Sequence, residues 1–289
     1  MNNKTKSVNR FRDMIEVFRC PHCKGSLKVV DEKSLKCANK HTFDFAKQGY
    51  VNFMTRSTNS HYDQSLFEAR QNIIMESELY TPIHKEISKV INTYMNSTIY
   101  PLLLFDAGCG EGSHLQKILN ECNTSALKGV GLDISKEGII MAAKKYKEQS
   151  WIVGDLANSP IAGQTFHVVL NILSPSNYKE FKRILVPDGL VIKVVPRPNY
   201  LKELRKALYG DTENNSNKNV EIVELFKKHF YLKEVINLSY QQTLDQKEVN
   251  NVMHMTPLSW NSKKTDVGAS INSISEITVD LDILVGFKK

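Results

Sequence analysis

A glycine-rich turn between an apolar strand and a helix constrains this chain more than any other feature. The stretch is LLLFDAGCGEGSHL, residues 102–115. It opens with an apolar run that predicts a buried strand ending at Asp106. Gly108, Gly110 and Gly112 follow, and they let main-chain N–H groups approach a ligand that a Cβ atom would keep away. The turn therefore predicts a loop that binds a nucleoside cofactor.

Acidic residues near this loop favour S-adenosylmethionine as the cofactor. Glu111 would repel a phosphate, and the G-x-G-x-G spacing departs from the dinucleotide pattern G-x-G-x-x-G. Asp133 ends the next expected strand and would hold ribose hydroxyls, whereas Asp155 follows the third strand and would face the adenine amino group. The alternatives are NAD as cofactor and, for both aspartates, N-capping of the helices that follow. The sequence thus predicts a methyltransferase, with residues 108–112 along the methionine end of the cofactor. Asp106, at the start of the turn, is also a predicted cofactor-binding residue.

Strand-like and helix-like segments alternate after residue 100, which predicts an α/β fold with a mostly parallel sheet. The expected strands are 102–106, 128–133, 150–154, 166–171 and 189–195, and the expected helices are 113–121, 135–147 and 177–185. The final run EITVDLDILVGF predicts a closing antiparallel strand. Upstream, apolar spacing predicts two helices between Leu66 and Met95 with a break at Thr81-Pro82.

Four metal-ligating side chains follow the spacing C-x2-C-x13-C-x3-H, and they are Cys20, Cys23, Cys37 and His41. Two pairs of ligands on separate turns suit a tetrahedral zinc ion, and four protein ligands indicate a structural metal. Such a site holds together a module that is too small for a sufficient apolar core. His22 is a competing but geometrically awkward ligand, and free thiols are the other alternative.

The N-terminal end also carries the excess of positive charge. Residues 1–60 contain 12 Lys and Arg against 5 Asp and Glu, so the whole net charge of +7 lies there. This asymmetry indicates a polyanionic partner, with a solvated basic surface as the alternative. Four nearby aromatic residues would either pack the small core or stack on an unpaired base; they are Phe43, Phe45, Tyr50 and Phe53.

Four parts are expected along the chain: a flexible basic tail (1–15), a zinc-binding RNA-recognition domain (16–56), a helical linker region (57–100) and a methyltransferase domain (101–289). Three of the five cysteines cluster with a histidine, which suits a reduced compartment. No apolar h-region follows the basic start, and no later stretch has the length of a membrane span. We therefore expect a cytoplasmic protein with no membrane partner.

Several longer runs occur together in this chain. They are FRCPHC, HTFDFAKQGYVNF (41–53), the pattern of Ala69, Arg70, Tyr80 and Pro82, DAGCGEG (106–112), GLDISKEGI (131–139), Ser174-Pro175, PRPNYLKEL from Pro196, and MTPLSW (255–260). In combination they resemble the bacterial 23S ribosomal RNA guanine-N1 methyltransferases of the RlmA type. The resemblance implies a class I (Rossmann-like) methyltransferase sheet, a small N-terminal zinc-binding domain, and a homodimer that embraces an RNA hairpin. It also implies zinc ligation by the four Cys/His residues and cofactor contacts by Tyr80, Glu111, Gly112 and Asp133.

One stretch departs from that family's pattern. After the fifth strand the family reads P-G-P-x-H-L, whereas here Arg197 replaces the glycine and Tyr200 replaces the histidine. Tyr200 is therefore a candidate cofactor-binding residue through its hydroxyl group, and the alternative is that it only packs in the core.

The expected reaction is transfer of a methyl group from S-adenosylmethionine to N1 of a guanine in a 23S rRNA hairpin loop. Because N1 lies on the Watson–Crick edge, the base must be unpaired or turned outward, and its proton needs an acceptor. Asn171 follows the fourth strand and is the candidate catalytic residue; its alternative role is hydrogen bonding in a buried turn. Two other functions stay open: a small-molecule methyltransferase with an accessory zinc ribbon, and a non-catalytic RNA-binding relative.

Overall fold

An eight-stranded sheet with the order β10-β11-β9-β8-β5-β6-β7-β4 organises the computed structural model. The structure describes residues 2–55, 62–95, 101–122, 127–210, 218–256, 258 and 271–289. The parallel part of the sheet consists of β5 (Leu102–Ala107), β6 (Leu127–Asp133), β7 (Ser150–Val153), β8 (Phe166–Ile172) and β9 (Leu185–Pro196). These strands confirm the predicted α/β class and the five predicted strand positions.

The direction of strand addition reverses at β5. From β5 the chain adds β6 and β7 on one side, through α4 (Ser113–Glu121) and α5 (Lys136–Lys145). It then returns to add β8 and β9 on the other side, with the short helices η2 (Leu156–Asn158) and α6 (Tyr178–Ile184) in the connections. Ligands of open α/β sheets bind at such a switch point, outside the carboxyl ends of the strands.

The C-terminal part of the chain completes the sheet with two long antiparallel strands. These are β10 (Phe230–Thr243) and β11 (Glu276–Lys288), and β11 lies between β9 and β10. The predicted closing antiparallel strand is therefore confirmed. The intervening helices are α7 (Lys202–Tyr209), α8 (Lys218–His229) and α9 (Gln246–Met255). Residues 211–217 and half of the MTPLSW run (257, 259 and 260) lie outside the described residues.

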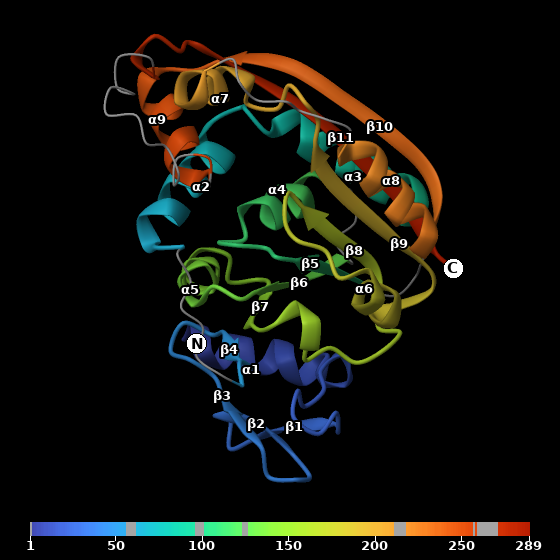
Figure 1. Ribbon diagram of the computed structural model, residues 1–289. Helices are drawn as coiled ribbons and strands as arrows, with labels where there is room; N and C mark the ends of the chain where they lie inside the picture. Colours follow the sequence, from blue (N-terminus) through green and yellow to red (C-terminus); the bar gives the residue numbers. More distant parts are fainter. Residues whose placement is uncertain are drawn as a thin grey trace.

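A small antiparallel sheet forms the opposite end of the molecule, at the bottom of Figure 1. It contains β1 (Leu27–Val30), β2 (Ser34–Cys37) and β3 (Thr42–Asp44), and the 3-10 helix η1 (Ile15–Val17) precedes it. The chain leaves this unit through β4 (Val51–Asn52), which pairs in parallel with β7. The N-terminal unit is thus joined to the edge of the large sheet by main-chain hydrogen bonds.

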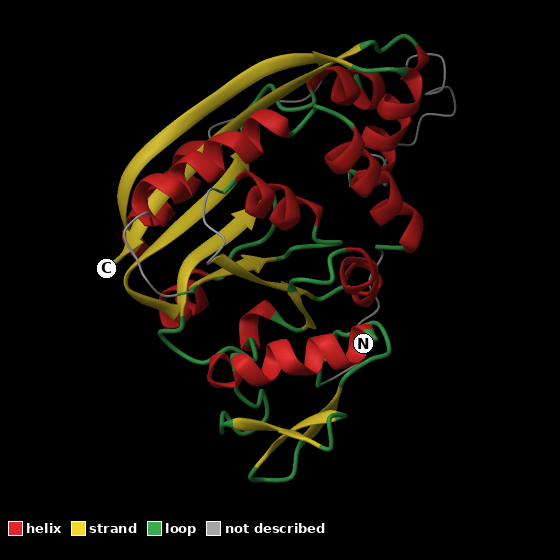
Figure 2. Ribbon diagram, turned by 180° about the vertical axis from the view of Figure 1, so that it is seen from behind, coloured by secondary structure: helices red, strands yellow, loops and turns green. Residues whose placement is uncertain are grey.

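The expected flexible tail is instead an ordered helix, α1 (Asn3–Asp13), which lies between the small sheet and the large one (Figure 2). Val8 and Phe11 are fully buried, and the Phe11 ring stacks on Phe18 with 4.6 Å between centroids. The segment is helical and ordered because its apolar side chains can be buried on one side. Val8 and Phe11 are three residues apart, so both lie on one side of a helix and are removed from water together.

The expected linker region also belongs to the body of the fold. Helices α2 (Gln64–Glu76) and α3 (Thr81–Met95) confirm the two predicted helices and their break. Their apolar side chains, such as Ile73 and Ile87, pack in the same buried cluster as Leu104 of β5. The polar stretch 55–65 is described only at Thr55 and from Tyr62 onward.

Alternate strand residues divide the apolar core between the two faces of the sheet. Leu104 belongs to the cluster with α2 and α3, whereas Phe105 belongs to the cluster that contains Phe11, Phe43 and Phe53 of the N-terminal end. Within the described residues, no helix combines the length and apolarity that a membrane crossing requires.

Candidate cofactor cleft and metal centre

A cleft of about 910 Å³ opens at the carboxyl ends of the parallel strands. Six of the predicted cofactor residues line it: Tyr80, Gly108, Gly110, Asp133, Asp155 and Tyr200. Asp106, Glu111 and Gly112 are described residues that do not line it. Sequence reasoning did not identify four further polar residues of the lining as site residues, and these are Arg70, His114, Ser174 and Lys193.

The glycine loop has a backbone conformation that other residues rarely adopt. Gly108 and Gly110 have φ angles of +80° and +58°. A Cβ atom on Gly110 would lie 2.8 Å from Nη1 of Arg70, and one on Gly108 would collide with Ser174. The loop is held open by Asp133, whose Oδ2 accepts from the main-chain N–H of Gly110 at 2.8 Å. The two glycines are therefore required by the close approach of Ser174 and Arg70, which also line the cleft.

Gly112 is required by close packing. It precedes α4 with a φ of +82°, and a Cβ atom there would collide with the Trp151 ring. It does not line the cleft, and its expected contact with the cofactor stays a prediction.

Glu111 faces Arg70 instead of the cleft. Its side chain is fully buried, and its Oε2 accepts a charge-assisted hydrogen bond from Nη1 of Arg70. A buried carboxylate needs such a partner, because an unpaired charge away from water is costly. Arg70 lines the cleft and Glu111 lies behind it. Asp106 is also buried, and burial raises its pKa to about 7.

The two aspartates expected at the cofactor differ in their surroundings. Asp133 is nearly buried at the end of β6, and its second oxygen accepts from the main-chain N–H of Ser135 at 2.8 Å. Asp155 is exposed and caps η2 by accepting from the N–H of Ala157 at 2.8 Å. The capping role considered for Asp155 is thus present alongside its place in the lining.

Two tyrosines from distant parts of the chain meet across one wall of the cleft. The hydroxyls of Tyr80, which precedes α3, and Tyr200, which follows β9, are 2.6 Å apart. Burial raises the pKa of both phenols, and for Tyr200 the rise is large. The Tyr80 ring also meets His114 edge to face at 5.3 Å. Tyr200 thus lines the cleft with its hydroxyl hydrogen-bonded to that of Tyr80, and its contact with the cofactor stays a prediction.

Asn171 is buried below the opposite wall and does not line the cleft. Its Nδ2 lies within hydrogen-bonding distance of the carbonyls of Ala107 (2.9 Å) and Pro175 (3.1 Å) and of the Ser174 hydroxyl (2.8 Å). Its Oδ1 accepts from Nζ of Lys193 at 2.7 Å. Asn171 therefore lies near the end of β8 and bonds to the buried segment after it, which is close to the alternative considered for it.

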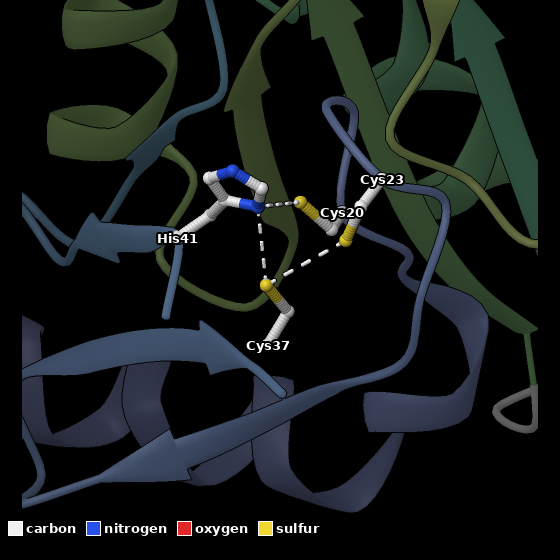
Figure 3. A group of neighbouring side chains, drawn as sticks. All are labelled: Cys20, Cys23, Cys37 and His41. Atoms are coloured by element: carbon white, nitrogen blue, oxygen red, sulfur yellow. Dashed lines mark hydrogen bonds between the residues drawn. The ribbon is translucent and has the colours of Figure 1, made fainter. Parts of the chain in front are cut away.

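The four predicted metal ligands converge in the N-terminal unit (Figure 3). Nδ1 of His41 lies 3.4 Å from Sγ of Cys20 and 3.3 Å from Sγ of Cys37, and the Sγ atoms of Cys23 and Cys37 are 3.7 Å apart. Ligand atoms about 2.3 Å from a tetrahedral metal are separated by about 3.8 Å. The spacing therefore matches a four-coordinate metal centre.

The residues around the four ligands bear on two alternatives from the sequence: His22 as a ligand, and aromatic rings that stack on a base. His22 is outside the group of ligands and instead lies against the His41 ring at 4.7 Å. Hydrogen bonds from Gly25 and His41 lower the pKa of Cys23 to about 6, which favours a thiolate. The aromatic residues considered for base stacking are all buried and pack the core; they are Phe43, Phe45, Tyr50 and Phe53.

Comparison with known proteins agrees with this arrangement of two units. Residues 18–56 match the family "RlmA, N-terminal", a zinc ribbon, and residues 104–189 match "Methyltransferase domain". Bacillus subtilis YxjB, whose name assigns it provisionally to the 23S rRNA (guanine-N1)-methyltransferases, is 42% identical over 94% of this chain and 97% of its own. The 23S rRNA (guanine(748)-N1)-methyltransferase of Streptomyces fradiae is 30% identical over 95% of this chain and 98% of its own. This chain therefore belongs to the RlmA family of 23S rRNA (guanine-N1)-methyltransferases.

Proposed function

We propose that this protein transfers a methyl group from S-adenosylmethionine to N1 of a guanine in a hairpin loop of 23S rRNA. One observation carries the proposal: a cleft floored by the glycine loop and Asp133 occurs in the same chain as a metal-binding ribbon of the RlmA type. The first unit suits a nucleoside cofactor, and the second, with its surplus of lysines, suits an RNA.

The residues around the glycine loop fit S-adenosylmethionine. Gly108 and Gly110 line the cleft, and without a Cβ atom they would let a ligand approach the main chain. Each oxygen of Asp133 accepts one main-chain hydrogen bond, and a carboxylate has capacity for further donors such as ribose hydroxyls. Arg70 is already neutralised by Glu111, so it does not demand a phosphate. When bound, the cofactor supplies an activated methyl group, and the chain's own task is to position the base against it.

The ribbon would contact the RNA through its exposed lysines rather than its aromatic rings. Exposed basic residues of this unit include Lys28, Lys33, Lys40 and Lys47. Phosphate contacts of this kind give affinity that falls steeply with salt. We assign zinc to the Cys/His centre, where it would hold β1, β2 and the intervening turns together. The family resemblance also supports a homodimer, which light scattering of the purified protein would test.

The test is methyl transfer from labelled S-adenosylmethionine to 23S rRNA purified from cells that lack this gene. We expect label in the RNA and a reverse-transcription stop at one guanine, because a methyl group on N1 blocks Watson–Crick pairing. Total metabolites serve as the competing substrate. Label in metabolites without label in RNA would contradict the proposal and favour a small-molecule methyltransferase.

A further inference from the structure

Lys193 is a buried cation that lines the cleft. Its side chain is 6% exposed, and it lines the cleft together with Ser174 and Pro175. Among the described residues it forms no ion pair, although burial of a lysine without one is unusual. The carboxylates of the lining are Asp133, which ends β6, and Asp155, which follows β7; both strands lie on the other side of β5.

The surroundings of Lys193 fix the direction of its amine. Lys193 is the register partner of Asn171 on the neighbouring strand, and its Nζ donates to Oδ1 of Asn171 at 2.7 Å and to the carbonyl of Ser174 at 3.4 Å. Asn171 cannot turn its amide around, because its Nδ2 is engaged by acceptors from Ala107, Ser174 and Pro175. Two acceptors therefore occupy two N–H groups of the amine.

This geometry leaves one position on the nitrogen for a substrate. A neutral primary amine has two N–H groups and one lone pair, so with both N–H groups held by Asn171 and Ser174 the lone pair is the remaining site. Burial lowers the pKa of Lys193 to about 8, which brings the neutral form within reach near neutral pH. A base of this strength suits general base catalysis.

We propose that Lys193 is the proton acceptor for N1 of the target guanine, a role that rests on the function proposed above. The lone pair of Nζ takes the proton from N1, and the electrons of the N–H bond stay on N1. N1 then takes the methyl group, and the electron pair of the methyl–sulfur bond remains on sulfur, which becomes a neutral thioether. Lys193 leaves the step as an ammonium group and returns its proton to solvent. Asn171 is a positioning residue in this scheme, because it orients the amine.

The deciding experiment measures single-turnover methyl transfer to 23S rRNA with the wild-type chain, Lys193→Met and Lys193→Arg. Arginine keeps the positive charge but does not accept a proton, because its pKa is above 12. We expect both variants to lose about 10²- to 10⁴-fold in rate. Lys288→Met is the matched control: Lys288 also lies on a strand, its Nζ donates to a main-chain carbonyl, and burial lowers its pKa. It lies outside the cleft lining, so its rate should stay within about twofold of wild type.

Chemical rescue separates loss of a base from loss of structure. Lys193→Ala should recover at least about tenfold in rate as methylamine is added, because a small amine can occupy the vacated space and accept the proton. Calorimetric titration with S-adenosylmethionine should give unchanged affinity for all variants. Two results would overturn the role of Lys193. One is a Lys193→Arg variant with more than a tenth of the wild-type rate, and the other is a Lys193→Ala variant whose rate does not rise when methylamine is added. Wild-type protein that labels no 23S rRNA would overturn the proposed function together with this role.

Discussion

The two ends of this molecule are stabilised in different ways. The strands of the N-terminal ribbon have two to four residues, and four ligand side chains within 4.8 Å of one another lie at its centre. The large sheet has strands of up to 14 residues, and the side chains of β11 are almost all buried. With zinc bound as proposed, one end would depend on an ion that a chelator can remove, whereas the other depends on apolar burial. Each end accordingly responds to its own kind of perturbation.

Removal of a metal ligand should separate the two ends most clearly. Cys37→Ser should abolish stoichiometric zinc and weaken RNA binding at least about tenfold, because zinc binding supplies about 10–16 kcal/mol of folding free energy in small zinc domains. Affinity for S-adenosylmethionine should stay within about twofold. Cys122→Ser is the control, since Cys122 is a partly buried thiol outside the cluster. Equal losses of RNA and cofactor affinity would show that the ends are not separable.

Lys193, the buried cation of the large sheet, should make the free energy of unfolding depend on pH. The folded pKa of Lys193 is about 8 against an ordinary value of 10.5, so between these values the unfolded chain holds a proton that the folded chain has released. Stability then rises with pH, by at most about 1.4 kcal/mol per pH unit. Relative to Lys193→Met, the wild-type chain should gain about 3 kcal/mol between pH 8 and pH 10.5. Urea unfolding of both proteins measures this, and parallel pH curves would contradict it.

An added methyl group should distinguish the packing of the two ends. A Cβ atom on Gly131 of β6 would collide with the Trp151 ring, whereas one on Gly25 of the ribbon would meet only Sγ of Cys23 at 3.5 Å. Gly131→Ala should cost about 2 kcal/mol of unfolding free energy, because close-packed cores do not absorb extra atoms. Gly25→Ala should change it by less than about 0.5 kcal/mol. Denaturant unfolding of the two variants provides the comparison, and equal effects would refute it.

The smallest expected effect concerns the ribbon's surface charge. Lys40→Ala removes one exposed cation and should weaken RNA binding less than about tenfold at moderate salt. The slope of log affinity against log salt should fall by about 0.7 to 0.9. Binding titrations at three salt concentrations measure the slope, and cofactor affinity is the internal control. An unchanged slope would remove Lys40 from the RNA-binding surface.

Local patterns predicted the strands and the ligand spacing, because each depends on residues close together in the chain. The run at 102–106 became β5, and C-x2-C-x13-C-x3-H became the metal centre. Contacts across long separations were not predictable in this way. Glu111 is neutralised by Arg70, which lies 41 residues earlier, so its placement behind the cleft depends on the packing of α2. Helix α1 was missed because only a few apolar residues, notably Val8 and Phe11, face the core from a polar segment.

Lys193 did have a signal that sequence reasoning left unused. It interrupts the apolar run GLVIKVV, where every neighbouring residue of β9 is buried. A single cation in a buried strand either pairs with a carboxylate or contacts a ligand. The sequence alone does not indicate which acidic residue, if any, would pair with Lys193. Only the register of β9 against β8 shows that Asn171 is its neighbour.

The short strand β4 has a consequence for how this chain can be dissected. Val51 and Asn52 pair with Ile152 and Val153, so β7 is not an open edge of the sheet. Unpaired edge strands recruit other chains and promote aggregation. A catalytic half that begins after residue 55 would present β7 uncovered and would also expose the face on which Phe11 and Phe53 pack. The N-terminal unit therefore covers this edge and this face, and we expect separate expression of the two halves to yield aggregated catalytic domain.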